Sequence, residues 1–204
     1  MNAAKLIAAL ALIWTCTVAG AQAQDLRRLT NETDLAFAGR ALHFGADDDA
    51  HVTAAAWNGT PTLFADYLVR IGAETNRVVV ALMRQPDGGY RQVQVTVGEE
   101  EGGVAQLAAF GLARADHSGR QSLITILSWT VNHPTLVEGT DYEIRIFAPP
   151  RPGQTTLTLA PISNRFAGGC ECWHGAEPGQ RQYHSHARFH TISAIRRELR
   201  RLGY

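Results

Sequence analysis

Residues 77–97 have the sequence RVVVALMRQPDGGYRQVQVTV, and they indicate the fold class most clearly. Two apolar runs, 77–84 and 90–97, flank the turn residues Pro86-Asp87-Gly88-Gly89. In the second run, valine alternates with glutamine and threonine, which is typical of a strand with one buried and one solvated face. The stretch therefore predicts a β-hairpin.

Four more apolar runs follow along the chain, each bounded by turn residues. They are residues 104–113, 123–131, 142–147 and 155–159. Runs of this length predict the strands of an antiparallel meander. The first run also fits a helix, because Val104, Leu107 and Gly111 recur with a helical period, so both interpretations stay open.

The chain before the hairpin is predicted to contain two strands and a helix. Residues 34–42 and 52–57 are the predicted strands, separated by the acidic loop 46–49. Thr60-Pro61 is typical of a helix N-cap followed by proline at the first helical position. The apolar residues that follow recur on one helical face; they are Leu63, Phe64, Tyr67, Leu68 and Ile71. A helix is therefore predicted over residues 61–71.

A second helix is predicted over residues 192–202. Thr191 fits its N-cap and Gly203 fits its end. Its apolar stripe consists of Ile192, Ile195, Leu199 and Leu202. Four arginines crowd the remaining surface; they are Arg196, Arg197, Arg200 and Arg201. Because this basic helix is about three turns long and lacks tryptophan, we expect it to pack on the sheet rather than lie on a membrane.

Together these elements predict an α+β fold. Its main part is an antiparallel β-sheet in a meander or sandwich-like arrangement. An internal helix is expected near residues 61–71 and a C-terminal helix near residues 192–202.

The first 23 residues have the pattern of a secretory signal. Lys5 gives a positive start, residues 6–18 form an uncharged apolar run, and Ala21-Gln22-Ala23 offers small residues at a cleavage site. The run is shorter than the roughly 20 residues that cross a bilayer as a helix. We therefore expect a cleavable signal peptide over residues 1–23, a single globular domain over residues 24–204, and a secreted or periplasmic location.

Charge is unevenly distributed along the expected mature chain. Residues 24–180 contain 12 arginines and 18 acidic residues, whereas residues 181–204 contain six arginines and one glutamate. We expect the basic tail to dock on the acidic body. An acidic body in an exported chain argues against a nucleic acid partner. The expected partner is an extracytoplasmic protein or a small ligand, and contact with a membrane surface is not expected.

Complete catalytic motifs are absent from the sequence. It contains no G-x-S-x-G, no G-x-x-x-x-G-K, no H-E-x-x-H and no S-x-x-K. The acidic runs at 47–49 and 99–101 lack the spaced oxygen ligands of a calcium loop, so we interpret both as solvated turns.

Residues 112–126, LARADHSGRQSLITI, resemble the strand, Asp-rich turn and strand unit of secreted FG-GAP or VCBS-like repeats. The matching positions are Asp116 and Gly119. His117, Ser118 and Ser122 stand where that family carries acidic calcium ligands. The resemblance implies two strands joined by a tight Asp-Gly turn in an exported protein.

Side chains that bind transition metals are concentrated near the end of the chain. Six of them fall within 21 residues: Cys170, Cys172, His174, His184, His186 and His190. Thiolates and imidazoles are the ligands that zinc and copper prefer. If residues 183–190 form a strand, its period of two places all three of their histidines on one face. The cluster therefore predicts a possible Zn or Cu site, and no other cofactor is indicated.

Three interpretations of this cluster stay open. The first is the polar surface of an edge strand beside a Cys170–Cys172 disulfide, which an exported chain favours. The second is a bound transition metal, and the third is a redox role for the Cys-Glu-Cys stretch. A catalytic zinc also needs a carboxylate or a general base, for which Glu171 and Glu177 are candidates that the sequence alone does not place.

The expected function is that of an exported, non-enzymatic binding or accessory domain of unknown ligand, because catalytic motifs are missing. The alternative is a transition-metal binding protein, or a metal-dependent enzyme, that uses the Cys/His cluster at residues 170–190.

Overall fold

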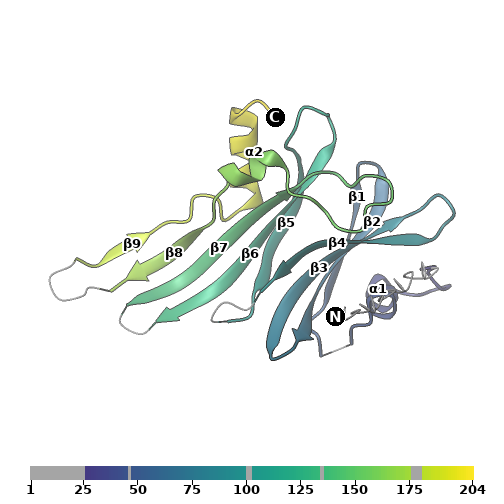
Figure 1. Cartoon of the computed structure of the whole chain (residues 1–204), viewed down its shortest axis with the longest axis horizontal. Coiled ribbons are helices and arrows are strands. Elements are labelled where there is room, and N and C mark those ends of the chain that lie inside the picture. Colours follow the sequence, from purple (N-terminus) through teal and green to yellow (C-terminus); the bar gives the residue numbers. More distant parts are fainter. Residues whose placement is uncertain (1–25, 46, 100–102, 134–135, 176–180) are drawn as a thin grey trace, which may run out of the picture.

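The computed structural model describes residues 26–45, 47–99, 103–133, 136–175 and 181–204 (Figure 1). The predicted signal, residues 1–23, lies outside the described residues. Within them the strands form two antiparallel sheets in which neighbours in sequence are neighbours in space. The first sheet contains β1 (His51–Trp57), β2 (Thr60–Ile71), β3 (Glu74–Arg84) and β4 (Tyr90–Gly98). The second contains β5 (Gln106–Arg114), β6 (Gln121–His133), β7 (Val137–Phe147), β8 (Gly169–His174) and β9 (Tyr183–Ser185).

Apolar residues from both sheets meet in a shared core, which contains Phe64 and Val93 of the first sheet and Leu123 and Phe147 of the second. The opposite face of the first sheet packs against helix α1 (Asp34–Leu42). The opposite face of the second packs against helix α2 (Ile192–Arg201) and the short 3₁₀ helix η1 (Pro161–Arg165). Figure 1 shows the helices on the outer sides of the two sheets. The expected mostly antiparallel α+β fold is therefore confirmed.

The predicted helix over residues 61–71 is wrong, because this stretch forms strand β2. Asn58 and Gly59 have positive φ angles of 51° and 82°, and they connect β1 to β2 as a two-residue hairpin loop. Residues 62–65 are buried without interruption, since Phe64 faces the shared core and its neighbours face α1. A strand covered on both faces has a continuous apolar run, and such a run does not distinguish a strand from a helix.

The predicted strand over residues 34–42 is also wrong, because these residues form α1. The Thr33 hydroxyl caps the helix by accepting a hydrogen bond from the Ala36 N–H at 3.2 Å. The buried residues recur at helical spacing; they are Phe37, Ala38, Ala41 and Leu42. His43 ends the helix in the left-handed conformation, with φ 61°. Thr33 followed by Asp34 was the helix signal in the sequence.

The hairpin predicted over residues 77–97 is confirmed as β3 and β4, which pair from Arg77↔Gly98 to Arg84↔Tyr90. The strands predicted at 52–57, 104–113, 123–131 and 142–147 are confirmed as parts of β1, β5, β6 and β7. The first of these later runs is thus a strand, and its helical alternative is wrong.

The strand predicted over residues 155–159 is wrong, because its backbone hydrogen bonds are divided between the two sheets. The Leu157 N–H donates to the Gln94 carbonyl of β4 at 2.9 Å. The Ala148 N–H, just beyond β7, donates to the Thr158 carbonyl at 2.9 Å. The segment therefore links the sheets through isolated bridges instead of extending either one.

Helix α2 confirms the predicted C-terminal helix and its packing on the sheet. The Thr191 hydroxyl accepts a hydrogen bond from the Ala194 N–H at 3.2 Å. Ile195 and Leu199 are buried against isoleucines of β6 and β7. Gly111 of β5 leaves room for the helix, because a Cβ there would lie 2.7 Å from a methyl carbon of Ile192. In the described part of the chain, no helix has the length and apolar composition needed to cross a membrane.

The turn between β5 and β6 has the tight form that the FG-GAP or VCBS-like resemblance implies. An Asp116 carboxylate oxygen accepts a hydrogen bond from the Ser118 N–H at 2.9 Å, and Gly119 has φ 76°. The resemblance to that family itself stays a prediction.

Candidate metal centre

Strands β8 and β9 form the last hairpin of the second sheet, and β9 is its edge strand. Cys172 pairs with Ser185, and Trp173 pairs with His184. Because side chains alternate between the faces of a strand, Cys172 and Ser185 lie on one face while Trp173 and His184 lie on the other. The group of ligands predicted from the sequence is therefore divided between two faces.

Cys170 and Cys172 are joined as a disulfide, with their Cα atoms 5.1 Å apart. Cys172 is fully buried. The neighbouring strand β7 makes room for it at Gly139, where a Cβ would lie 2.9 Å from the Cys172 sulfur. Cysteine binds metal as a thiolate, which a disulfide does not offer. The two cysteines are thus unavailable as ligands in this state.

His174 lies on the same face as the disulfide. Its Nε2 is 2.9 Å from the Ser185 hydroxyl oxygen, and its ring stacks on Tyr183 with centroids 4.3 Å apart. The Ser185 hydroxyl in turn donates to the Cys170 carbonyl at 2.9 Å. These contacts hold the imidazole on the face opposite His184.

Strand β9 ends at Ser185, so the strand predicted over residues 183–190 is wrong in its second half. Phe189 packs instead with the core beneath α2, and Ala187 is buried. The chain therefore leaves the strand after Ser185 and bends at residues 188–189. His190 follows this bend, and its Nδ1 lies 2.6 Å from the Ala187 carbonyl oxygen. His190 is therefore not on the strand face that the sequence predicted it to share with His184 and His186.

The structure brings together Glu171, His184 and His186. The Nδ1 atom of His186 lies 2.7 Å from Glu171 Oε1, and that of His184 lies 3.8 Å from the same oxygen. The two imidazole centroids are 4.7 Å apart. One ligand atom from each residue lies within 4.8 Å of the others. Ligand atoms around a tetrahedral zinc ion are about 3.3–3.6 Å apart, so small side-chain rotations would close the group on an ion.

Glu171 is oriented by two hydrogen bonds. Its Oε1 bonds to His186, and its Oε2 accepts the Ala187 N–H at 3.0 Å. The bond with His186, followed by that with the Ala187 backbone, holds the pKa of Glu171 below its ordinary value. The carboxylate is therefore ionised and held in position, which is what a metal ligand requires.

The group is open to solvent. The His184 and His186 side chains are 46% and 74% exposed, and that of Glu171 is 34% exposed. Trp173, the cross-strand neighbour of His184, is 38% exposed. An ion would reach these ligands directly from water.

Two of the six ligands predicted from the sequence, His184 and His186, thus lie together. Glu171 joins them because Cys172 pairs with Ser185 at the end of β9, and the residues that come next, Glu171 and His186, meet there. The sequence alone does not give the pairing of these two strands, so it named Glu171 only as a candidate. Glu177 lies outside the described residues.

The acidic run at 47–49 has protein partners. Asp48 Oδ2 accepts the Gly45 N–H at 2.6 Å, and Asp49 Oδ2 accepts a hydrogen bond from Arg77 at 2.6 Å. Of the run at 99–101, only Glu99 is among the described residues. Asp48 and Asp49 therefore hold the loop through protein partners, and the ion pair of Asp49 with the buried Arg77 departs from the solvated turn that the sequence predicted.

Comparisons with protein-family models, with curated proteins and with solved structures found no match. The fold and the side-chain chemistry described above are therefore the basis for a functional proposal. They define a mostly antiparallel β protein with an open His-His-Glu group at a sheet edge.

Proposed function

We propose that this protein is an exported, non-enzymatic binding domain whose ligand is a divalent transition-metal ion, Cu(II) or Zn(II). The ligands are His184, His186 and Glu171. The observation that carries the proposal is the convergence of their donor atoms within 4.8 Å at an exposed sheet edge.

The backbone places these ligands at little cost in chain entropy. His184 and His186 are two residues apart and share one face, and Glu171 comes from the adjacent strand. Ligands that the backbone already holds close together lose less freedom when an ion binds. The hydrogen bond from Ala187 adds a fixed orientation for the carboxylate.

The donor set favours copper and zinc. Two imidazole nitrogens and one carboxylate oxygen suit Cu(II) and Zn(II), whereas thiolate ligands are absent from the group because the nearby cysteines form a disulfide. At a site with unconstrained geometry, Cu(II) is expected to bind more tightly than Zn(II).

Exposure of the site favours binding over catalysis. Metal enzymes use a dry, shaped cavity to strengthen interactions with the transition state. Here the His186 side chain is 74% exposed and faces water. We therefore place this domain among metal-binding or metal-delivering proteins.

The test is a titration of protein prepared without an affinity tag, with Cu(II) followed by electron paramagnetic resonance and Zn(II) by calorimetry. Replacing His184 and His186 together with Ala should weaken binding by at least about 100-fold, and Glu171→Gln by about tenfold or more. His133→Ala is the matched control, because it removes an exposed histidine at the end of β6. Equal affinity of the wild type and the double variant would refute the site.

Export is tested separately by the intact mass of the protein recovered outside the cytoplasm. We expect the mature chain to begin at or near Gln24, after the small residues Ala21-Gln22-Ala23. An exported chain that retains residues 1–23 would contradict the signal, and it would leave the metal site unaffected.

A further inference from the structure

The Cys170–Cys172 disulfide is a chemically distinctive group to which the metal proposal gives no role. Along β8 the two cysteines alternate with Glu171 and Trp173, so the bridge lies on the face opposite the metal ligands. Figure 1 shows β8 and β9 at the side of the second sheet that points away from β1–β4. Among the described strands, none from the first sheet therefore covers the bridge.

Backbone pairing holds the two cysteines in place on both sides of β8. Cys170 pairs with Asp141 of β7. Cys172 pairs with Gly139 of β7 and with Ser185 of β9. The Ser185 hydroxyl also donates to the Cys170 carbonyl at 2.9 Å. Because none of these contacts uses a sulfur atom, they are expected to persist when the bridge is reduced.

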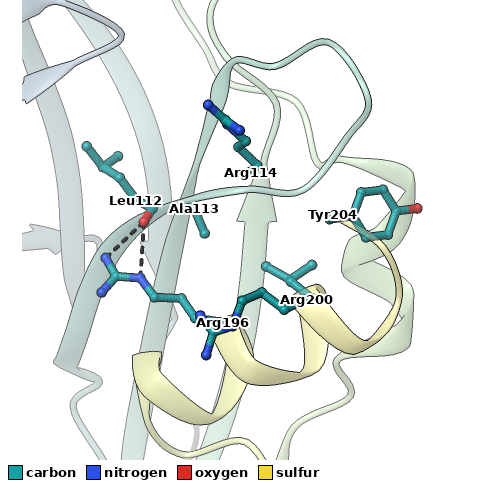
Figure 2. A pocket seen from close by; sticks show the side chains of 7 residues that line it. Leu112, Ala113, Arg114, Arg196, Arg200 and Tyr204 are labelled. Carbon is teal, nitrogen blue, oxygen red and sulfur yellow. Dashed lines mark hydrogen bonds between the residues drawn. The ribbon is translucent and has the colours of Figure 1, made fainter.

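The rest of the second sheet is also held independently of the bridge. Helix α2 packs on it through the buried residues Ile195 and Leu199. At the other edge of the sheet, the Nε and Nη2 atoms of Arg196 donate to the Leu112 carbonyl of β5 at 3.2 and 2.9 Å (Figure 2). We therefore expect the disulfide form and the dithiol form to fold in the same way.

A bridge of this kind adds little to the stability of the fold. It closes a loop with a single intervening residue, which removes little freedom from the unfolded chain. Thermodynamic linkage requires the reverse as well, because the fold protects the bridge against reduction only as much as the bridge stabilises the fold. That protection should be no more than about 30-fold. Structural disulfides of exported proteins, by contrast, resist reduction by glutathione.

The two cysteines differ in their access to solvent. Cys170 is partly exposed, whereas Cys172 is fully buried. Gly139 leaves the space that the Cys172 sulfur occupies, because a Cβ there would lie 2.9 Å from that sulfur. Thiol–disulfide exchange begins when a thiolate attacks a sulfur that it can reach. Attack is therefore directed to Cys170, with Cys172 as the leaving group.

We infer that this disulfide is an exchange centre that oxidises pairs of thiols, one pair for each bridge. A substrate thiolate attacks Cys170 Sγ, the bond to Cys172 Sγ breaks, and Cys172 leaves with the electron pair and takes a proton from water. A second substrate thiol loses its proton to water and attacks the substrate sulfur of the mixed disulfide, which releases Cys170 as a thiolate that is then protonated. The substrate thiols lose two electrons and two protons, and the bridge gains them. A disulfide compound such as oxidised glutathione restores the bridge by the reverse step.

The first test equilibrates the folded protein with reduced and oxidised glutathione without denaturant, followed by acid quenching, alkylation and intact mass. The protein should convert completely between its disulfide and dithiol forms as the ratio of the glutathione species is varied, and the circular dichroism of the two forms should match. A bridge that stays oxidised until denaturant is added would be structural and would overturn the inference. A dithiol form that unfolds would overturn it as well.

The cysteines of a polypeptide and a small thiol compound offer the same chemistry. A synthetic peptide with two cysteines and dithiothreitol are therefore compared as reductants of the folded protein. Faster reduction by the peptide identifies a polypeptide substrate, and equal or faster reduction by dithiothreitol identifies a small thiol. Either result supports the exchange centre, and failure of both reductants overturns it.

Single-cysteine variants test the direction of attack. Cys172→Ala leaves the Cys170 thiol, which should react with the neutral reagent dithiodipyridine in the folded state at least about tenfold faster than the buried thiol that Cys170→Ala leaves. The matched control is the same pair of variants in denaturant, where both should react at one rate. Equal rates in the folded state would overturn the order of attack and the inference with it. None of these measurements depends on the proposed metal ligands.

Discussion

Arg77 is 1% exposed, and its Nη2 atom donates a hydrogen bond of 2.6 Å to Asp49 Oδ2. The Nη1 atom of the same side chain donates to Asp66 Oδ1 of β2 at 3.0 Å. Its Nη2 also bonds to the Gln106 side chain of β5 at 3.1 Å. A single buried guanidinium thus connects the loop before β1, the first sheet and the second sheet.

Replacing Arg77 with Met should lower the free energy of unfolding by about 3–5 kcal/mol. The variant removes one partner of a buried ion pair and leaves Asp66, whose side chain is 14% exposed, without its cation. Chemical denaturation at neutral pH measures the change. Arg84→Met at the exposed end of the same strand is the control and should change stability by less than about 0.5 kcal/mol. Equal stability of the Arg77 variant and the control would contradict this role.

The loss caused by Arg77→Met should grow with pH across the carboxyl range. Burial raises the pKa of Asp66, and Arg77 opposes that rise. Arg77 also lowers the pKa of Asp49 by its hydrogen bond. Without the arginine both folded-state pKa values rise, so ionisation of Asp49 and Asp66 is less favourable in the folded variant than in the folded wild type. A variant that is equally destabilised at pH 3 and pH 7 would refute this reasoning.

Glu32 gives the fold a separate dependence on pH. Hydrogen bonds from Arg40, at 2.8 Å, and then from the Leu29 N–H lower the pKa of Glu32 from 4.5 to about 2. A lowered folded-state pKa stabilises the protein above the unfolded-state value, and this contribution is lost as the pH falls from 4.5 to about 2. Glu32→Gln should therefore reduce the thermal midpoint at pH 6 and have little effect at pH 2.

The control for Glu32 is Glu74→Gln, which alters an exposed glutamate at the start of β3. Its effect on the midpoint should be the same at both pH values. If the difference between Glu32→Gln and the wild type persists unchanged at pH 2, the Arg40 pair is not the source of the acid sensitivity.

Leu199→Ala should destabilise the protein by about 2–5 kcal/mol, because it leaves a cavity beneath α2. Leu199 is 1% exposed and packs with the isoleucines of β6 and β7. Thermal or chemical unfolding measures the loss. Arg197→Ala, on the exposed side of the same helix, should cost less than about 0.5 kcal/mol. An unfolding midpoint that Leu199→Ala leaves in place would argue that the helix is not held by its apolar stripe.

Local signals explain which parts of the fold the sequence predicted correctly. The hairpin at residues 77–97 has alternating apolar and polar residues in its second strand and a Pro-Asp-Gly-Gly turn. Both patterns report on local backbone geometry. The C-terminal helix has an N-cap residue and an apolar stripe within one short segment. By contrast, β2 is covered by the second sheet on one face and by α1 on the other. Its residues are apolar on both faces because of these contacts, which are distant in sequence. The turn Asn58-Gly59 is the local signal that would have indicated a strand in place of the predicted helix.

The proposed metal site shows the same division between local and distant information. The spacing of His184 and His186 predicted that they share a face, which is a property of one strand. Their convergence on Glu171 depends on the register of two strands, and the separation of His190 accompanies a bend after β9 that packs the partly buried Phe189 against the core beneath α2. Neither relationship is encoded within a short segment. Residue spacing therefore predicted two of the proposed ligands, and the tertiary structure added the third.

Thiol labelling distinguishes the possible states of Cys170 and Cys172 in exported protein. We expect a disulfide, so denatured and unreduced protein should react with no alkylating reagent at either residue, and both should react after reduction. A thiolate pair bound to metal would instead react once the protein is denatured with a chelator and no reductant. Because the bridge closes a very short loop, its reduction should lower stability by only roughly 1–2 kcal/mol.

Zn(II) binding at His184, His186 and Glu171 should survive that reduction if the cysteines are not ligands. Loss of Zn(II) affinity in Cys170→Ser, with the histidines intact, would show that a sulfur ligand had been overlooked.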